Sequence, residues 1–346
     1  MILWQFKKIE KLNSRLSTAF MSTSMLPYIQ SQMNYYGYPI LLVVGDFGNI
    51  LIIIIFHGHK YNACSLYLVS SAMANIFYLT VGGLIRIFAS SYSTWSLQAL
   101  IMCKLSNYIP GFFGQVTKTL LVCACIDRYM ITSKSVRLRA FSTLKRAKYV
   151  TAIVYIAWAI IPIHILIWVT ISNGQCTRIG WYVTFQAFYT VFCIAFLPAI
   201  IVFIFGFLTY RNMKQLHSRI QPINHDMDTN NNNNSLKRRD RDLLIFVLAE
   251  AIIYLVTTAP YSLVSLEMMI TQFVLPIKYL SLIQAEIFAT NVALLLIFIF
   301  SAIPFYTYLA VSASFRRDVK HLFVRNYRKL RGLPADSRTN IIRQTE

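Results

Sequence analysis

The chain has 346 residues, of which 56% are hydrophobic, and a formal net charge of +20 at pH 7. A soluble domain of this length has too little interior to bury so many apolar side chains, which excludes a soluble globular fold. The basic residues lie in short segments between long uncharged stretches, a pattern typical of membrane proteins rather than of nucleic-acid-binding proteins. The six cysteines form no Cys/His cluster with zinc spacing, so we expect no metal site and no cofactor.

Seven apolar runs along the chain are each long enough to cross a bilayer. A hydrocarbon core of about 30 Å needs about 20 apolar residues as a helix, and inside lipid the backbone must satisfy its own hydrogen bonds. We predict an all-α membrane protein, a seven-transmembrane helix bundle over residues 36–311. The predicted spans are Tyr36–Phe56, Cys64–Ala89, Ile101–Ile131, Tyr149–Ile171, Gly180–Tyr210, Leu243–Ile270 and Tyr279–Val311.

The Lys and Arg residues outside the spans, together with Arg86 and Lys104 near the outer ends of two spans, are divided unevenly between the two sides of this bundle. One side carries 23 of them and the other carries 8. Because cytoplasmic segments are enriched in basic residues, we place the richer side in the cytoplasm and residues 1–35 outside the cell. The third cytoplasmic loop then covers residues 211–242 and includes Asn230–Asn234, a polar run that cannot pack a core. This predicts a multi-pass plasma-membrane protein with an extracellular N-terminus and a cytoplasmic C-terminus.

The cytoplasmic tail, residues 312–346, begins with a patterned segment. From Phe315 to Phe323, apolar and basic residues alternate at helical spacing. This predicts an amphipathic eighth helix that lies on the anionic inner leaflet. The alternative is a solvated run of charges.

The inner end of the third predicted span carries the triplet Asp127-Arg128-Tyr129, and Cys103 lies 25 residues before Arg128 at the outer end of the same span. An arginine at a membrane boundary is costly to desolvate unless it finds a partner or reaches water. The motif and its spacing resemble rhodopsin-like (class A) G-protein-coupled receptors. The resemblance covers residues 36–325. Further family positions match on the expected spans at Gly48, Asn49, Trp158, Pro198 and Pro260, and in the first outer loop at Trp95.

The resemblance implies a receptor, not an enzyme, that passes the signal of an extracellular ligand to a heterotrimeric G protein. Arrestin, a receptor kinase and membrane lipid are further partners that the family implies. It also implies a disulfide between Cys103 and Cys176 in the second extracellular loop, although two free buried thiols are the alternative.

In the resembling family, the arginine of the triplet is held by acidic partners in the inactive receptor. The implied partners of Arg128 are Asp127 and Asp240, which lies 20 residues before Pro260. Asp242 and several basic residues surround Asp240, and Arg128 could instead simply reach the membrane surface.

Several positions depart from the family pattern. Asn75 stands where the family keeps an aspartate that contributes to a sodium site, and a neutral amide holds a cation far less well. Thr258 replaces a usual tryptophan after Tyr254, and the segment Pro304–Tyr308 replaces Asn-Pro-x-x-Tyr, with Tyr308 aligned to the family tyrosine. The pattern resembles divergent invertebrate receptors, including FMRFamide-receptor-like ones. We assign the core switch to Asn49, Asn75, Lys118, Pro198, Glu250, Tyr254 and Pro260.

Lys118 and Glu250 are charged residues in the middle of predicted spans. An unpaired charge is costly in a membrane, so each should face the bundle interior. Counting from Arg128 and Pro260 places both near the level of Pro198. This suggests a buried ion pair that rearranges on activation. Alternatively, each bonds separately to water or hydroxyl groups.

Polar residues near the outer ends of the spans could bind a ligand or only solvate the rim. They are Arg86, Tyr108, Glu267, Gln284 and Glu286. The position where amine receptors keep an aspartate is Pro110, and the seventh span has no lysine for a retinal Schiff base. A neuropeptide ligand is therefore preferred by elimination.

A transporter or channel and a membrane enzyme are the alternative classes of membrane protein. A polytopic transporter or channel would show matched broken helices and a polar path through the bundle, and only scattered residues such as Asp46, Lys118 and Glu250 support it. A membrane enzyme would need a catalytic cluster at a membrane face, and the sequence shows none.

Overall fold

The computed structural model describes residues 25–57, 62–87, 97–172, 175–178, 180–219, 231–274 and 280–331. The fold is helical apart from one two-stranded hairpin. The elements are η1 (Met33–Gly37), α2 (Tyr38–His57), α3 (Ala63–Ile87), α4 (Leu97–Thr132), α5 (Val136–Phe141), α6 (Leu144–Ile160), α7 (Ile163–Trp168), β1 (Val169–Ser172), β2 (Gln175–Arg178), α8 (Trp181–Phe188), η2 (Tyr189–Phe196), α9 (Leu197–Arg219), α10 (Asn231–Val274), α11 (Leu280–Ala302), α12 (Pro304–Val311) and α13 (Ala313–Leu330).

Within the described ranges, seven helical stretches are long and apolar enough to span a membrane. They are Met25–Phe56, Ala63–Ile87, Gln98–Thr132, Leu144–Trp168, Trp181–Asn212, Asp242–Thr271 and Ser281–Ala302. The predicted fold class, an all-α bundle of seven membrane helices, is confirmed.

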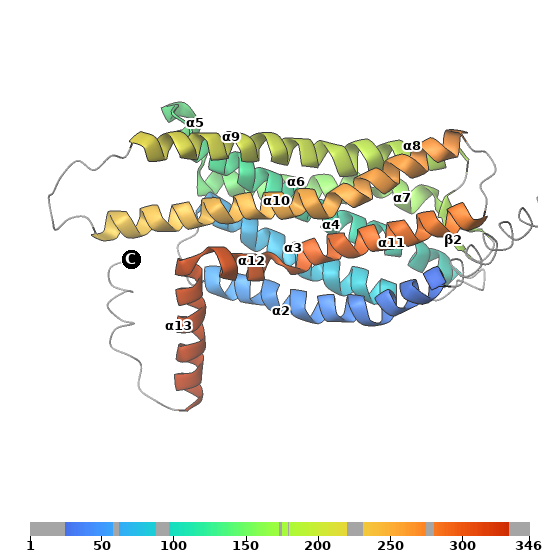
Figure 1. The fold of residues 1–346 in the computed structure, drawn as a ribbon, viewed down its shortest axis with the longest axis horizontal. Coiled ribbons are helices and arrows are strands. Elements are labelled where there is room, and N and C mark those ends of the chain that lie inside the picture. Colours follow the sequence, from blue (N-terminus) through green and yellow to red (C-terminus); the bar gives the residue numbers. More distant parts are fainter. Residues whose placement is uncertain are drawn as a thin grey trace, which may run out of the picture.

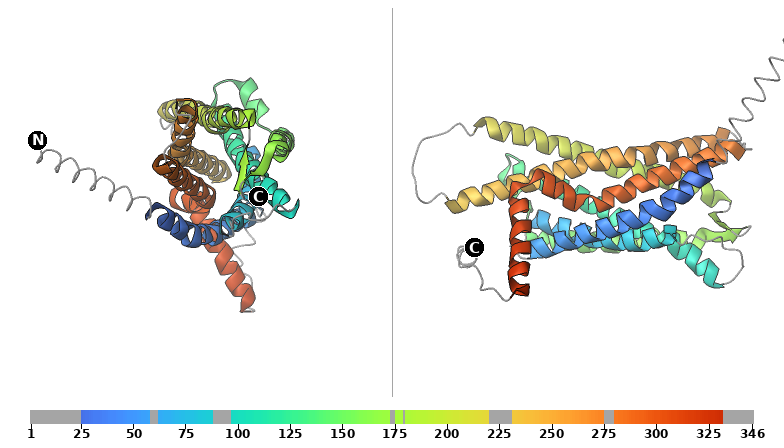
Figure 2. Two further views of the ribbon diagram at one scale, coloured as in Figure 1. Left: turned by 90° about the vertical axis from the view of Figure 1, so that its right-hand side faces the viewer. Right: turned by 60° about the horizontal axis from the view of Figure 1, so that its bottom comes forward.

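The long helices run side by side along one axis and pack around a common centre (Figures 1 and 2). The antiparallel hairpin of β1 and β2 lies at one end of this bundle, and α13 runs across the other end, almost perpendicular to the axis (Figure 1). We call these the hairpin end and the α13 end. The predicted eighth helix corresponds to α13, which has apolar and basic residues on different faces.

The outward faces of the helices are apolar. On α2, the side chains of Val43 and Phe47 are 65% and 54% exposed, and on α9 Phe203 and Phe207 are 61% and 55% exposed. Exposure of so wide an apolar surface to water would be unfavourable, whereas contact with the apolar tails of lipids is not. The polar residues Asn49, Asn75 and Glu250 are buried instead.

A glycine permits a close approach between α2 and α11. A Cβ atom built on Gly45 would lie 2.6 Å from Leu79 Cδ1, 2.7 Å from Ala302 Cβ and 2.9 Å from Ala302 Cα. The last of these is a backbone atom, which cannot rotate away. Small residues at such contacts allow membrane helices to pack with their backbones close together.

Proline residues divide two of the predicted spans. The fourth was expected to continue to Ile171, but α6 ends at Ile160, a turn at Pro162 follows, and the chain enters β1 at Val169. The seventh was expected to be continuous from 279 to 311, but α11 ends at Ala302 and α12 starts at Pro304. Proline lacks the amide donor that an uninterrupted helix needs, and it favours the first turn of a new one.

The fifth span also changes its hydrogen-bonding pattern near a proline. The π-helix η2 covers Tyr189–Phe196, immediately before Pro198 in the first turn of α9. A wider turn of this kind accommodates the missing amide donor without ending the helix.

The predicted third loop, residues 211–242, is helical in its described parts, 211–219 and 231–242. Helix α9 continues to Arg219, and α10 begins at Asn231, inside the polar run of asparagines. Once a helix is nucleated by packing of its apolar part, each added residue gains a hydrogen bond, and Lys and Arg are good helix formers.

Candidate functional site

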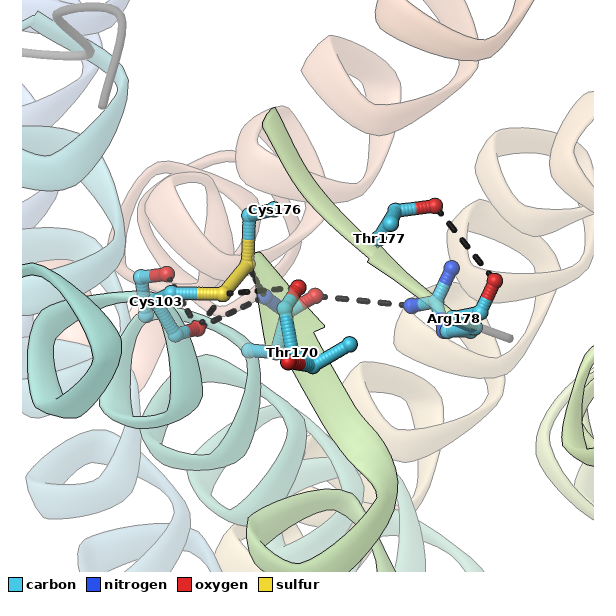
Figure 3. The surroundings of a disulfide bond; sticks show 7 residues. Cys103, Thr170, Cys176, Thr177 and Arg178 are labelled. Carbon is cyan, nitrogen blue, oxygen red and sulfur yellow. Dashed lines mark hydrogen bonds between the residues drawn. A yellow bond between two sulfur atoms is a disulfide. The ribbon is translucent and has the colours of Figure 1, made fainter. Parts of the chain in front are cut away.

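A disulfide joins the hairpin to α4 at the hairpin end. Cys103 on α4 and Cys176 on β2 are bonded, with their Cα atoms 5.6 Å apart (Figure 3). Cys103 is fully buried, and Ile171 pairs with Cys176 across the two strands. The disulfide that the family resemblance implied is present. A covalent link over 73 residues limits the freedom of the unfolded chain and contributes about 2–4 kcal/mol to stability.

Hydrogen bonds hold the same hairpin against α4. Asn107 Nδ2 of α4 donates to Cys176 Sγ at 3.4 Å, and Arg178 Nη2 donates to Asn107 Oδ1 at 3.4 Å. Figure 3 shows Arg178 reaching from the strand towards this helix. The hairpin is therefore fixed to α4 by one covalent bond and by polar contacts beside it.

The other end of α4 carries a buried ion pair. Arg128 Nη2 lies 2.8 Å from Asp127 Oδ2, and the two side chains are 1% and 3% exposed. Ser142 Oγ, between α5 and α6, donates to Asp127 Oδ1 at 2.5 Å. Charge-assisted bonds of this kind are stronger than neutral ones, particularly away from water. Tyr129, the third residue of the triplet, packs edge-on against Phe205 of α9, with ring centroids 5.5 Å apart.

The predicted partner Asp240 belongs to α10, but its side chain lies outside the part of the molecule that the structure describes. The contact between Arg128 and Asp240 therefore stays a prediction. Asp242, two residues further along, accepts a hydrogen bond at 2.9 Å from Ser312 Oγ at the start of α13. Ser312 Oγ also accepts from the amide of Phe315, so this serine caps α13 while it bonds to α10.

An aromatic cluster joins α10 to the last helices at the α13 end. The ring of Phe246 on α10 stacks on Tyr308 of α12 with centroids 3.7 Å apart. Tyr308 also lies 4.5 Å from Phe315 of α13 and 5.5 Å from Phe56 of α2. A movement of α10 away from the bundle would separate Phe246 from Tyr308 and would strain the bond between Asp242 and Ser312.

Lys118 and Glu250 are both buried, at 4% exposure each, but they do not form the expected pair. No salt bridge or hydrogen bond joins these two residues, whose side chains the structure describes in full. Glu250 lines a small internal cavity to which Lys118 contributes nothing. Counting along helices gave a level in the bundle, but not the direction in which each side chain points. The hypothesis of an ion pair is therefore wrong for this arrangement.

The cavity lies between α2, α3, α4, α10, α11 and α12. Asn49 and Asn75 line it, and Asn75 Nδ2 donates to Asn49 Oδ1 at 3.4 Å. Asn49 Nδ2 in turn donates to the carbonyl oxygens of Gly45 at 2.8 Å and Ser301 at 3.1 Å. Tyr308 also lines the cavity. The structure therefore brings together three of the predicted core-switch residues, Asn49, Asn75 and Glu250, with Tyr308, the residue aligned to the family tyrosine.

The remaining predicted switch residues lie elsewhere on the same helices. Pro198 is in the first turn of α9 and Pro260 is inside α10. Tyr254, one helical turn beyond Glu250, is fully buried, and its ring centroid lies 5.3 Å from that of Phe300 on α11.

The five predicted rim residues lie towards the hairpin end but do not form one cluster. Glu286 is 7% exposed and accepts a hydrogen bond from Thr271 Oγ1 at 3.1 Å, which links α11 to α10. Tyr108 points away towards α6, where its hydroxyl donates to the carbonyl oxygen of Ala159 at 2.6 Å. Arg86 is in the last turn of α3, Gln284 is half-buried on α11, and Glu267 is exposed on α10.

Comparison with known proteins decides between the classes of membrane protein. Residues 48–303 match the family model described as 7 transmembrane receptor (rhodopsin family). This chain belongs to the rhodopsin family of seven-transmembrane receptors. The family consists of receptors and not enzymes, and the chain is a multi-pass membrane protein.

Individual relatives of this receptor are distant. A Gq-coupled rhodopsin of Mizuhopecten yessoensis is 25% identical over 240 residues, which cover 65% of this chain and 48% of that protein. The thyrotropin-releasing hormone receptor of Mus musculus is 26% identical over 153 residues, covering 42% of this chain and 38% of the relative. The type-1 angiotensin II receptor of Bos taurus is 27% identical over 121 residues, covering 34% and 33%. The chain thus spans less than half the length of these relatives.

The span-two carboxylate that contributes to the family's sodium site is replaced by the amide of Asn75 in this receptor. Asn75 offers an amide in place of a carboxylate, and its nitrogen is directed at Asn49. A hard cation needs several converging oxygen ligands, whereas the cavity here is lined largely by apolar side chains such as Leu68, Leu120 and Phe300.

Sequence reasoning missed Ser142, Asp242, Phe246 and Ser312 of this receptor. Ser142 carries no signal in the sequence, because its bond to Asp127 depends on the fold of the segment between α5 and α6. Ser312 could have been found, since a serine before an amphipathic run is a typical helix cap.

Proposed function

We propose that this receptor couples binding of an extracellular ligand to nucleotide exchange on a heterotrimeric G protein. The observation that carries the proposal is that one helix, α4, has the disulfide at its hairpin end and the buried Asp127–Arg128 pair at its α13 end. Binding of the ligand and binding of the G protein are coupled through α4, because each prefers one arrangement of the bundle over the other. Arrestin and a receptor kinase are proposed as further partners at the α13 end.

The proposed orientation puts the hairpin end outside the cell and the α13 end in the cytoplasm, in the plasma membrane. Disulfides form and persist in oxidising compartments, which supports an extracellular Cys103–Cys176 bond. The Lys and Arg residues of α5, the start of α6 and α13 gather at the opposite end. Basic residues are typical of cytoplasmic segments, which supports the same orientation.

We propose a neuropeptide as the ligand. Two of the relatives, the thyrotropin-releasing hormone receptor and the angiotensin II receptor, are named for peptide ligands. The rhodopsin among the relatives suggests a retinal ligand instead, but α11 contains no lysine to form a Schiff base. Charged side chains at the hairpin end, such as Arg86, Glu267 and Glu286, suit a polar peptide better than an apolar chromophore.

The proposed function is tested by GTPγS exchange in membranes that contain the receptor and a G protein. A neuropeptide library is first screened by calcium and cAMP readouts, and any active peptide is then used in the exchange assay. We expect Arg128→Ala to change basal exchange and to reduce stimulated exchange at least about tenfold, because a buried, charge-bonded side chain contributes on the order of 1.4 kcal/mol or more.

The matched control is Arg137→Ala, because Arg137 is an exposed arginine on α5 at the same end of the bundle. It should leave exchange unchanged. Equal exchange in wild type and Arg128→Ala, together with solute or ion flux that is insensitive to G protein, would support a transporter or channel and contradict the proposal.

A further inference from the structure

Glu250 is a carboxylic acid buried in the middle of a membrane helix. Its side chain is 4% exposed, and its Oε1 atom has no hydrogen-bond partner among the described residues. It lines the internal cavity from α10, where its neighbours include Leu120, Leu121 and Phe246. An ionised carboxylate in such surroundings is strongly unfavourable unless something neutralises it.

No basic side chain in the described part of the bundle neutralises Glu250. Lys118 does not line the cavity and forms no salt bridge with it, and Arg128 is held by Asp127 near the α13 end. The titratable groups that line the cavity are the phenols of Tyr67 on α3 and Tyr308 on α12. The thiol of Cys125 on α4 is also close enough to interact electrostatically, and α9 contributes no residue to the cavity.

A metal cation is a poor fit as the neutralising group. The cavity is small, with room for about one water molecule. Glu250 is the only carboxylate among the residues that line the cavity, whereas divalent cation sites in proteins combine carboxylates with several further oxygen ligands. A proton needs no ligand shell, because it forms a covalent bond to one carboxylate oxygen.

We propose that Glu250 is a proton-binding site that is occupied in this arrangement of the bundle and is released when α10 moves to admit water to the cavity. The cavity and the burial of the Glu250 carboxyl support the proton-binding site itself, whereas the link between this site and signalling rests on the function proposed above. Glu250 binds the proton more tightly in the arrangement described here than in an arrangement in which water enters the cavity, because water stabilises the ionised carboxylate. Lower pH on the side from which water enters therefore favours the described arrangement, and higher pH favours the open one.

Infrared difference spectroscopy of the purified receptor tests the binding site without any ligand or G protein. A protonated carboxylic acid gives a carbonyl stretching band separate from that of carboxylate, and the band shifts in heavy water. We expect this band in wild type near neutral pH and its loss in Glu250→Gln, which keeps the shape of the side chain. Glu250→Leu, which suits the apolar wall, should lose the same band if Glu250→Gln folds poorly.

The matched control is Asp46→Asn, because Asp46 is a half-buried carboxylate on α2 that already accepts a hydrogen bond at 2.7 Å from Thr80. The band assigned to Glu250 should persist in this variant. An identical set of acid bands in wild type, Glu250→Gln and Glu250→Leu would overturn the proton site.

The link to the bundle is tested by a fluorescent reporter on α10 followed against pH. One linked proton shifts the balance between two arrangements by up to about tenfold per pH unit, and this shift should vanish in Glu250→Gln. An unchanged pH dependence in Glu250→Gln would overturn the coupling. A failure of the G-protein experiment with Arg128→Ala would leave the infrared result standing, so the two proposals fail separately.

Discussion

The carboxylate of Asp127 is bound from two directions. Arg128 holds one oxygen at 2.8 Å, and Ser142 donates to the other at 2.5 Å. A carboxylate fixed at both oxygens has little freedom to rotate, so Ser142 helps to hold Asp127 in position for Arg128. The ion pair is thereby connected to the corner between α5 and α6, in the segment that joins α4 to α6.

We predict that Ser142→Ala raises basal GTPγS exchange. The loss of a hydrogen bond to a buried charged group costs on the order of 1 kcal/mol, which corresponds to about a fivefold shift towards the arrangement in which the pair is released. The control is Ser135→Ala, because the Ser135 side chain forms no capping bond although it precedes α5. Basal exchange equal to wild type in both variants would show that Ser142 does not stabilise the inactive pair.

Close packing of α2 against α11 depends on the absence of a side chain at Gly45. A methyl group there would lie 2.9 Å from the backbone of Ala302, so the two helices would have to separate. At Gly111 on α4, by contrast, the nearest atom to an added Cβ is Ile165 Cδ1 at 4.0 Å.

We predict that Gly45→Ala lowers the thermal unfolding midpoint of the purified receptor, with an overpacking cost of about 1–3 kcal/mol. Gly111→Ala should leave the midpoint unchanged or raise it, because alanine favours a helix over glycine by roughly 0.5–1 kcal/mol. The account of helix packing would be contradicted if the two variants had the same midpoint.

The helices themselves were predictable, because an apolar run long enough to cross a bilayer must form a helix to satisfy its backbone hydrogen bonds. The interruptions of these helices were harder to predict. Pro162 and Pro304 are visible in the sequence, but proline within a membrane helix can produce a break, a kink or a π-turn, and neighbouring helices decide which one occurs. The sequence did not predict that α9 and α10 extend beyond the apolar runs, because hydropathy identifies only the part of a helix that lies in the membrane and not the residue at which the helix ends.

At the scale of the whole molecule, motif spacing gave the level of each residue along the bundle but not its direction around a helix. The levels of Cys103 and Arg128 were enough to place the disulfide and the ion pair, because these two residues lie at opposite ends of one helix. The proposed pair of Lys118 and Glu250 failed, since both lie deep in the bundle but only Glu250 faces the cavity. Contacts such as that of Phe246 with Tyr308 join distant segments, so only the packed bundle reveals them.

The central claim is that the two ends of the bundle face opposite compartments, with the ion-paired end in the cytoplasm. The most direct test uses single cysteines at Gln98 on α4 and Arg137 on α5, which are both exposed, in a receptor whose exposed Cys193 is replaced by serine. A membrane-impermeant maleimide should label Gln98→Cys in intact cells and Arg137→Cys only after permeabilisation. Labelling of both positions in intact cells would contradict the account.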